Sequence, residues 1–111
     1  MGLFTPAKKI IDKEEVKIMM EELSRHNFKQ SQRDFVENIV LKAHMDPGTF
    51  NNPNPGIDEE EVGILHKDLS DRNSTLHQEL VKKGVSEDNI QYIGEELDTF
   101  LNTVRRKGFL G

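Results

Sequence analysis

The sequence predicts an all-α protein, a small four-helix bundle in which one domain spans residues 1–111. Four segments carry apolar residues every three or four positions, the spacing that gathers side chains on one face of a helix. A residue suited to capping a helix precedes each segment, and no segment alternates apolar and polar residues as a strand does. An irregular loop at residues 47–57, rich in asparagine, proline and glycine, separates two shorter helices from a long helical hairpin.

Composition excludes several kinds of chemistry and partner. The chain has no cysteine and a formal net charge of −5. Without cysteine it forms no disulfide and no thiolate metal site, which is compatible with a reducing, cytoplasmic compartment. An acidic chain repels phosphate backbones, and no apolar run reaches the roughly 20 residues that span a bilayer. We therefore expect a cytoplasmic protein that binds neither nucleic acid nor membrane and uses no cofactor.

The first helix is expected to begin at Asp12, after an extended lead-in over residues 1–10. The Asp12 side chain can accept a hydrogen bond from a first-turn amide while Glu15 reaches back to the start of the helix, which makes a capping box. The helix should end near His26. Val16, Met19, Met20 and Leu23 recur in it at helical intervals.

The second helix is expected to begin with Ser31 as its cap and to end before Pro47. A proline pushes the residue before it out of helical geometry, so the helix cannot continue into the loop. Its apolar face consists of Phe35, Val36, Ile39, Val40 and Ala43.

The third helix is expected to span residues 58–83. Asp58 can cap it, and Glu61 can return a hydrogen bond to the cap. Its apolar face consists of Val62, Leu65, Leu69, Leu76 and Leu80. Residues 70–75 form helix poorly, but they contain neither glycine nor proline, so the pattern favours one long helix. A break within residues 70–75 is the alternative.

The fourth helix follows a predicted Schellman motif. Gly84 closes the preceding helix, and Leu80 and Val85 are placed for the apolar contact that accompanies this motif. Ser86 then caps the fourth helix, which should end at Gly108. Its apolar face consists of Ile90, Ile93, Leu97, Phe100, Leu101 and Val104.

The loop before the third helix partly resembles an EF-hand calcium loop. Four oxygen-bearing residues fall at ligand positions three, five, nine and twelve of such a loop: Asn52, Asn54, Asp58 and Glu61. However, Phe50 stands at position one, and Gly56 falls at position seven where the motif requires glycine at six. Helix capping accounts for Asp58 and Glu61 without a metal ion. We therefore predict no metal site, and a degenerate EF-hand-like calcium-binding protein is one alternative.

The histidines and serines give no coherent catalytic set. No two of the four histidines lie four residues apart, and on a continuous helix His66 and His77 would lie roughly 16 Å apart, too far for one metal ion. The sequence contains no Gly-x-Ser-x-Gly nucleophile motif and no glycine-rich phosphate loop. We predict no catalytic residue, and a protein that is not an enzyme is the expected outcome.

The last third of the chain supplies a second alternative. It carries Leu76-His-Gln-Glu-Leu80, Gly84-Val-Ser86 and Gly94-Glu-Glu-Leu-Asp98. This pattern resembles the small sporulation-regulating aspartyl-phosphate phosphatases, helical hairpins with Ser-Gln-x-Leu-Asp on the second helix. Leu97 and Asp98 match that motif, whereas Gly94 and Glu95 stand where the family has serine and glutamine. The resemblance implies a phosphoaspartate phosphatase-like regulator in which Asp98 is the residue to test.

Taken together, the sequence favours a non-enzymatic helical interaction or regulatory module that binds a protein partner or itself. Six apolar residues lie outside the main helical faces and are candidates for partner binding: Met20, Phe28, Phe50, Ile64, Tyr92 and Phe109. Amphipathic helices that bury one another commonly offer a further apolar surface to a partner. The alternative is that these six side chains complete the core. The pattern leaves open the identity of the partner, the oligomeric state and the role of residues 47–57.

Overall fold

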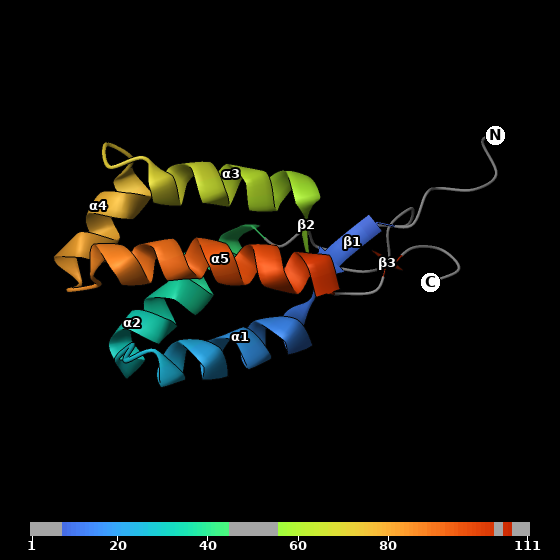
Figure 1. Cartoon of the computed structure of the whole chain (residues 1–111), viewed down its shortest axis with the longest axis horizontal. Helices are drawn as coiled ribbons and strands as arrows, with labels where there is room; N and C mark the ends of the chain where they lie inside the picture. Colours follow the sequence, from blue (N-terminus) through green and yellow to red (C-terminus); the bar gives the residue numbers. More distant parts are fainter. Residues whose placement is uncertain (1–7, 45–55, 104–105, 108–111) are drawn as a thin grey trace.

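The computed structural model of the chain describes residues 8–44, 56–103 and 106–107 (Figure 1). Its elements in chain order are β1 (Lys8–Ile11), α1 (Lys13–Arg25), α2 (Gln30–Phe35), the π-helix η1 (Val36–Leu41), the 3₁₀-helix η2 (Lys42–His44), β2 (Ile57–Asp58), α3 (Glu59–Ser70), α4 (Thr75–Lys82), α5 (Glu87–Thr103) and β3 (Arg106–Lys107). Helices make up most of the described chain, which confirms the predicted all-α class. Apart from Gly56 and Ile57, the predicted loop at residues 47–57 lies outside the described residues.

Helix α5 lies at the centre of the bundle, with α3 along one side and α1 and α2 along the other (Figure 1). The apolar faces of these helices meet in one core, whose burial supplies the main driving force for folding. Its buried members are Ile11, Val16, Met19, Leu23, Phe28, Val36, Val40, Leu41, Ile57, Val62, Leu65, Leu69, Leu80, Val85, Ile90, Ile93 and Leu97.

Two of the predicted helix starts are confirmed in atomic detail. The Asp12 carboxylate accepts a hydrogen bond from the Glu15 amide at 3.0 Å, and the Glu15 carboxylate accepts one from the Asp12 amide at 2.8 Å. At the start of α3, the Asp58 carboxylate accepts from the Glu61 amide at 2.9 Å. The side chains therefore satisfy amides that have no partner within their own helices.

The prediction that Ser31 caps the second helix is wrong. Helix α2 begins at Gln30, with Lys29 in the extended conformation of a cap residue. The Gln32 side chain decides this start, because it accepts from the Lys29 amide at 2.8 Å and donates to the Lys83 carbonyl at 3.0 Å. Gln32 is buried, so both of its polar atoms need partners and the start of α2 is fixed where they are found.

The prediction of one continuous helix over residues 58–83 is also wrong. Helix α3 ends at Ser70, Asp71 is extended, and α4 begins after Ser74. The Asp71 carboxylate accepts from the Asn73 amide at 2.9 Å, and the Ser74 hydroxyl accepts from the His77 amide at 3.1 Å. Short polar side chains that bond to nearby amides compete with the helix, and here that competition breaks it.

A small sheet corrects the prediction that the chain has no strand. It also corrects the predicted end of the fourth helix at Gly108, since α5 ends at Thr103 and β3 follows at Arg106–Lys107. Strand β1 pairs antiparallel with β2 on one side and with β3 on the other. Ile11 lies opposite Ile57 in the register, and both side chains are fully buried. The pairing therefore attaches the residues before α1 to the start of α3. Four residues are too few for an alternating pattern to be recognised in the sequence.

Two glycines in different backbone conformations, Gly84 in the Schellman motif after α4 and Gly63 in α3, should respond oppositely to substitution by alanine. The Val85 amide donates to the Leu80 carbonyl at 3.0 Å, and Gly84 has a φ of +84°. Gly84→Ala should lower the free energy of unfolding by about 1–2 kcal/mol, because a Cβ is strained in the left-handed region. Gly63→Ala, in α3 with open space at its Cβ position, should raise it by up to ~1 kcal/mol. Urea denaturation of both variants tests this, and changes of the same sign would contradict it.

Candidate functional site

A cleft of about 610 Å³ opens between the C-terminal end of α3, the start of α4 and the N-terminal half of α5. Its lining residues are His66, Leu69, Ser70, Arg72, His77, Glu87, Asp88, Ile90, Gln91, Gly94, Glu95 and Asp98. The break between α3 and α4 brings both His66 and His77 into this one cleft. The straight helix that would have kept them three turns apart does not form.

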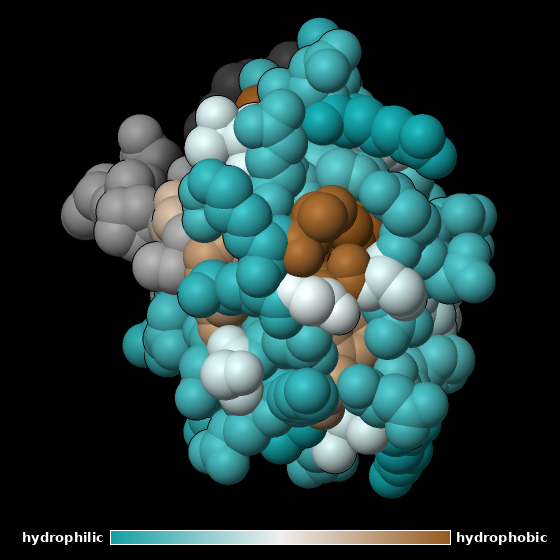
Figure 2. Space-filling model, turned by 90° about the vertical axis from the view of Figure 1, so that its left-hand side faces the viewer, coloured by the Kyte–Doolittle hydropathy of each residue, from teal (hydrophilic) through white to brown (hydrophobic). Residues whose placement is uncertain are grey.

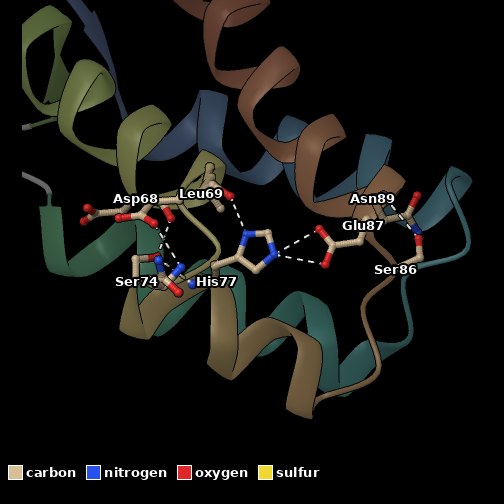
Figure 3. A network of polar contacts seen from close by, with 9 residues as sticks. Asp68, Leu69, Ser74, His77, Ser86, Glu87 and Asn89 are labelled. Carbon is tan, nitrogen blue, oxygen red and sulfur yellow. Dashed lines mark hydrogen bonds and ion pairs between the residues drawn. The ribbon is translucent and has the colours of Figure 1, made fainter.

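His77 is the most buried polar residue of the cleft, with 5% of its surface exposed. Its Nδ1 lies 2.6 Å from the Leu69 carbonyl oxygen and its Nε2 lies 2.9 Å from a Glu87 carboxylate oxygen (Figure 3). Both partners are acceptors, so the ring makes both contacts as hydrogen bonds only when both of its nitrogens carry a proton, that is, as an imidazolium. The hydrogen bond to Leu69 and then the contact with Glu87 raise the pKa of His77 above its ordinary value of 6.5, although burial opposes them.

The sequence around His77 explains this position. The His77 amide donates to the Ser74 hydroxyl, which in turn donates to the Asp68 carbonyl near the end of α3 (Figure 3). Carbonyls at a helix C-terminus lack partners within the helix and carry partial negative charge, so they favour a cation. Glu87 lies in the first turn of α5, where a carboxylate is favoured for the opposite reason.

A second histidine–carboxylate pair lies further along the cleft. The Nε2 atom of His66 on α3 is 3.0 Å from a carboxylate oxygen of Asp98 on α5, and both side chains are about half-exposed. Gly94 makes room for this pair, because a Cβ at that position would lie only 3.2 Å from the His66 Nε2. Glycine inside a helix costs about 1 kcal/mol relative to alanine. A Cβ at Gly94 would therefore require the His66 ring to shift by a few tenths of an ångström.

The cleft carries more negative than positive charge. Helix α5 contributes four carboxylates to its lining, from Glu87, Asp88, Glu95 and Asp98. They face Arg72 and the His77 ring. Neither Asp88 nor Glu95 forms an ion pair with any residue in the described part of the chain. Such a wall attracts cations and repels anionic groups.

The lining residues are not arranged for nucleophilic or metal chemistry. The Ser70 hydroxyl donates to the His66 carbonyl at 2.8 Å, a contact within one turn of helix that leaves it unconnected to an imidazole base. Among residues 8–44, 56–103 and 106–107, no three histidine or acidic side chains stand close enough to form a metal-binding group.

The predicted partner-binding residues that the structure describes differ in exposure. Phe28 is buried in the core, and Met20 and Tyr92 pack against it, whereas Ile64 is 44% exposed on α3. Phe50 and Phe109 lie outside the described residues. Burial and then a hydrogen bond to Glu96 raise the pKa of the Tyr92 hydroxyl far above its usual range.

The predicted metal-binding residues and Asp98 also lie in different parts of the chain. Asn52 and Asn54, the weak metal candidates from the loop, lie outside the described residues. Asp58 is engaged as the cap of α3 by the Glu61 amide. Among the predicted site residues that the structure describes, only Asp98 lines the cleft. The sequence pattern did not predict the cleft. The one signal for it was the segment at residues 70–75, which forms helix poorly.

The face that carries α4 is mostly hydrophilic. Figure 2 shows this end of the molecule, where polar residues surround a small hydrophobic patch. Val81 on α4 is 48% exposed and lines a shallower hollow together with His77 and Glu87. Small apolar areas of this kind are normal on proteins, so charge is the more distinctive property of this region.

Gly94→Ala should break the contact between His66 and Asp98 without lowering the stability of the fold. The new Cβ would press on the imidazole, and the half-exposed ring can move into solvent. The free energy of unfolding should stay equal or rise by up to ~1 kcal/mol, since the helix gains alanine and an exposed pair contributes little. In NMR spectra, Asp98→Asn should shift the His66 ring resonances of the parent protein but not of Gly94→Ala.

Gly63→Ala is the matched control for that experiment, because it makes the same change in α3 with no neighbour at the Cβ position. It should leave the response of His66 to Asp98→Asn intact. A Gly94→Ala protein in which His66 still responds to Asp98→Asn would show that the glycine is not required for the pair.

Comparison with known proteins gives no match to a family model, to a curated protein or to a solved structure. Within the described residues, no helix is both long and apolar enough to cross a membrane. The residues of the cleft and their charges are therefore the features of this chain that bear on its function.

Proposed function

We propose that this chain is a non-enzymatic interaction or regulatory module that binds a basic segment of a partner protein in the cleft between α3, α4 and α5. The observation that carries the proposal is the wall of four carboxylates that α5 presents to a hollow of about 610 Å³. The proposal places the protein in a reducing, cytoplasmic compartment, because the sequence contains no cysteine.

The spacing of the acidic residues suits an elongated ligand. Glu87 and Glu95 lie eight positions apart, and Asp98 follows three positions later, so the three lie along one side of α5. A partner segment with lysine or arginine at similar intervals can meet them in turn. Asp88 and Glu95, which have no ion pair within the described chain, supply charge that a partner would neutralise.

The floor of the cleft suits the side chains of such a segment. Leu69 and Ile90 line it and are buried in the core, so the bottom of the cleft is apolar while its α5 wall is charged. Lysine and arginine have long apolar stems that pack on such surfaces while their charged ends reach carboxylates. Charge complementarity of this kind mainly gives specificity and fast association.

The same charges argue against the phosphatase alternative. Asp98 is held by His66 in a cleft whose wall also carries Glu87, Asp88 and Glu95. A phosphorylated aspartate would bring further negative charge to this wall, which the carboxylates repel. The cleft therefore supports binding of a basic partner better than it supports attack on an acyl phosphate.

A synthetic peptide with lysine at every third or fourth position is the probe for this proposal. The protein should bind it in calorimetric titration, and binding should weaken as salt is raised, because salt screens exposed charges. Glu95→Lys should lower the affinity about tenfold, which corresponds to about 1.4 kcal/mol. A glutamate-rich peptide of equal length should not bind.

Glu21→Lys is the matched control, because it makes the same change in net charge on α1, which lies on the other side of α5 (Figure 1). It should leave the affinity within about twofold of the parent value. Equal losses in both variants would show that only the overall charge matters, and no binding at low salt would overturn the proposal. Light scattering shows whether a second copy of the chain occupies the cleft instead.

A further inference from the structure

We infer that His77 is a pH-dependent clasp: as an imidazolium it ties the C-terminal end of α3 to the N-terminal end of α5, and loss of its proton releases the corner formed by α4. This inference does not depend on the proposed function. It rests on the geometry of one buried side chain that belongs to α4 and contacts both neighbouring helices (Figure 3).

No neutral form of the ring satisfies both contacts. A neutral imidazole has one N–H and one lone pair, whereas the Leu69 carbonyl and the Glu87 carboxylate both accept. Deprotonation therefore places a lone pair against an oxygen on one side or the other. Only 5% of His77 is exposed, whereas the Glu87 side chain is 54% exposed, so the contact with Glu87 is the one that deprotonation opens.

The clasp acts on a whole corner because His77 is also part of the start of α4. Its amide donates to the Ser74 hydroxyl, whose proton goes to the Asp68 carbonyl of α3. Displacement of the His77 ring thus disturbs the cap of α4 and the last turn of α3 together. At the other end of α4, the Schellman motif at Gly84 keeps the connection to α5 short.

The charges around His77 decide the direction of the response. The charged and titratable groups that line the two hollows beside it are His66, Arg72, Lys82, Glu87, Asp88, Glu95 and Asp98. Glu87 is the one among them that contacts the ring, and Arg72 opposes the imidazolium. The net effect, together with the Leu69 carbonyl, is a His77 pKa above 6.5.

The raised pKa of His77 in the folded state determines how the stability of the fold changes with pH. The unfolded chain releases the His77 proton near its ordinary pKa of 6.5, and the folded chain holds it to higher pH. The stabilisation by the clasp is complete below pH 6.5 and is lost as pH rises through the pKa of the folded state. The clasp is thus closed in acid and opens on the alkaline side.

An NMR titration of the His77 ring tests the inference. In the parent protein the midpoint should lie above 6.5, and the amide resonances of α4 should shift with the same midpoint. The melting temperature should fall as the pH rises above 6.5 and through the pKa of His77 in the folded state. Glu87→Gln should move the His77 midpoint down toward 6.5 and reduce the fall in melting temperature.

Asp88→Asn is the matched control, because it also removes a carboxylate from the first turn of α5 but leaves the contact with His77 in place. It should keep the His77 midpoint and the full pH dependence of the parent. A parent midpoint at or below 6.5, α4 amides that ignore it, or equal shifts in Glu87→Gln and Asp88→Asn would each overturn the inference.

Discussion

Helix α3 ends with carbonyls that no further turn of helix satisfies, and the start of α4 supplies their donors. The His77 ring donates to the Leu69 carbonyl, and the Ser74 hydroxyl donates to that of Asp68. The same serine accepts from the His77 amide and so begins the next helix. The cleft forms because the last carbonyls of α3 accept hydrogen bonds from the start of α4 and not from a further turn of α3. A helix that continued through the turn would carry His77 roughly 16 Å beyond His66, whereas the turn brings both into one hollow against α5.

Two residues of the cleft are poor choices for stability alone. Gly94 lies within α5, where alanine would favour the helix, and His77 is a buried residue that bonds to both of its partners only as a cation. Each is explained by what it positions: the glycine admits the His66 ring, and the imidazolium joins three helices. Departures from local rules tend to collect at functional sites. Their concentration in one hollow is a reason to place the proposed partner there and not on the scattered apolar side chains of the surface.

Two helix ends were predictable because the residues that make them are close in sequence. The Asp12 capping box and the Gly84 Schellman motif each involve a few neighbouring residues, and both are present. The start of α2 was mispredicted because Gln32 bonds to Lys83, which lies 51 residues away. The cleft could not be predicted for the same reason. Its two histidine–carboxylate pairs join different helices, and they meet only because a weak helical segment gives way to side-chain hydrogen bonds.

The His77 imidazolium and a cationic ligand in the cleft both interact with the same carboxylate, that of Glu87. While the imidazolium holds it, Glu87 contributes little free negative charge to the α5 wall, and a cationic ligand must share it. A lysine or arginine that bound to Glu87 would weaken the hold on the His77 proton. By linkage, loss of that proton would favour the ligand by the same free energy. Opening of the corner acts in the opposite direction, since it disturbs the end of α3 that forms part of the cleft floor. The pH dependence of peptide binding is therefore the difference between these two effects. Binding becomes stronger at high pH only if the gain from the freed Glu87 charge exceeds the loss from the disturbed cleft floor, which requires α5 to keep its position when α4 is released.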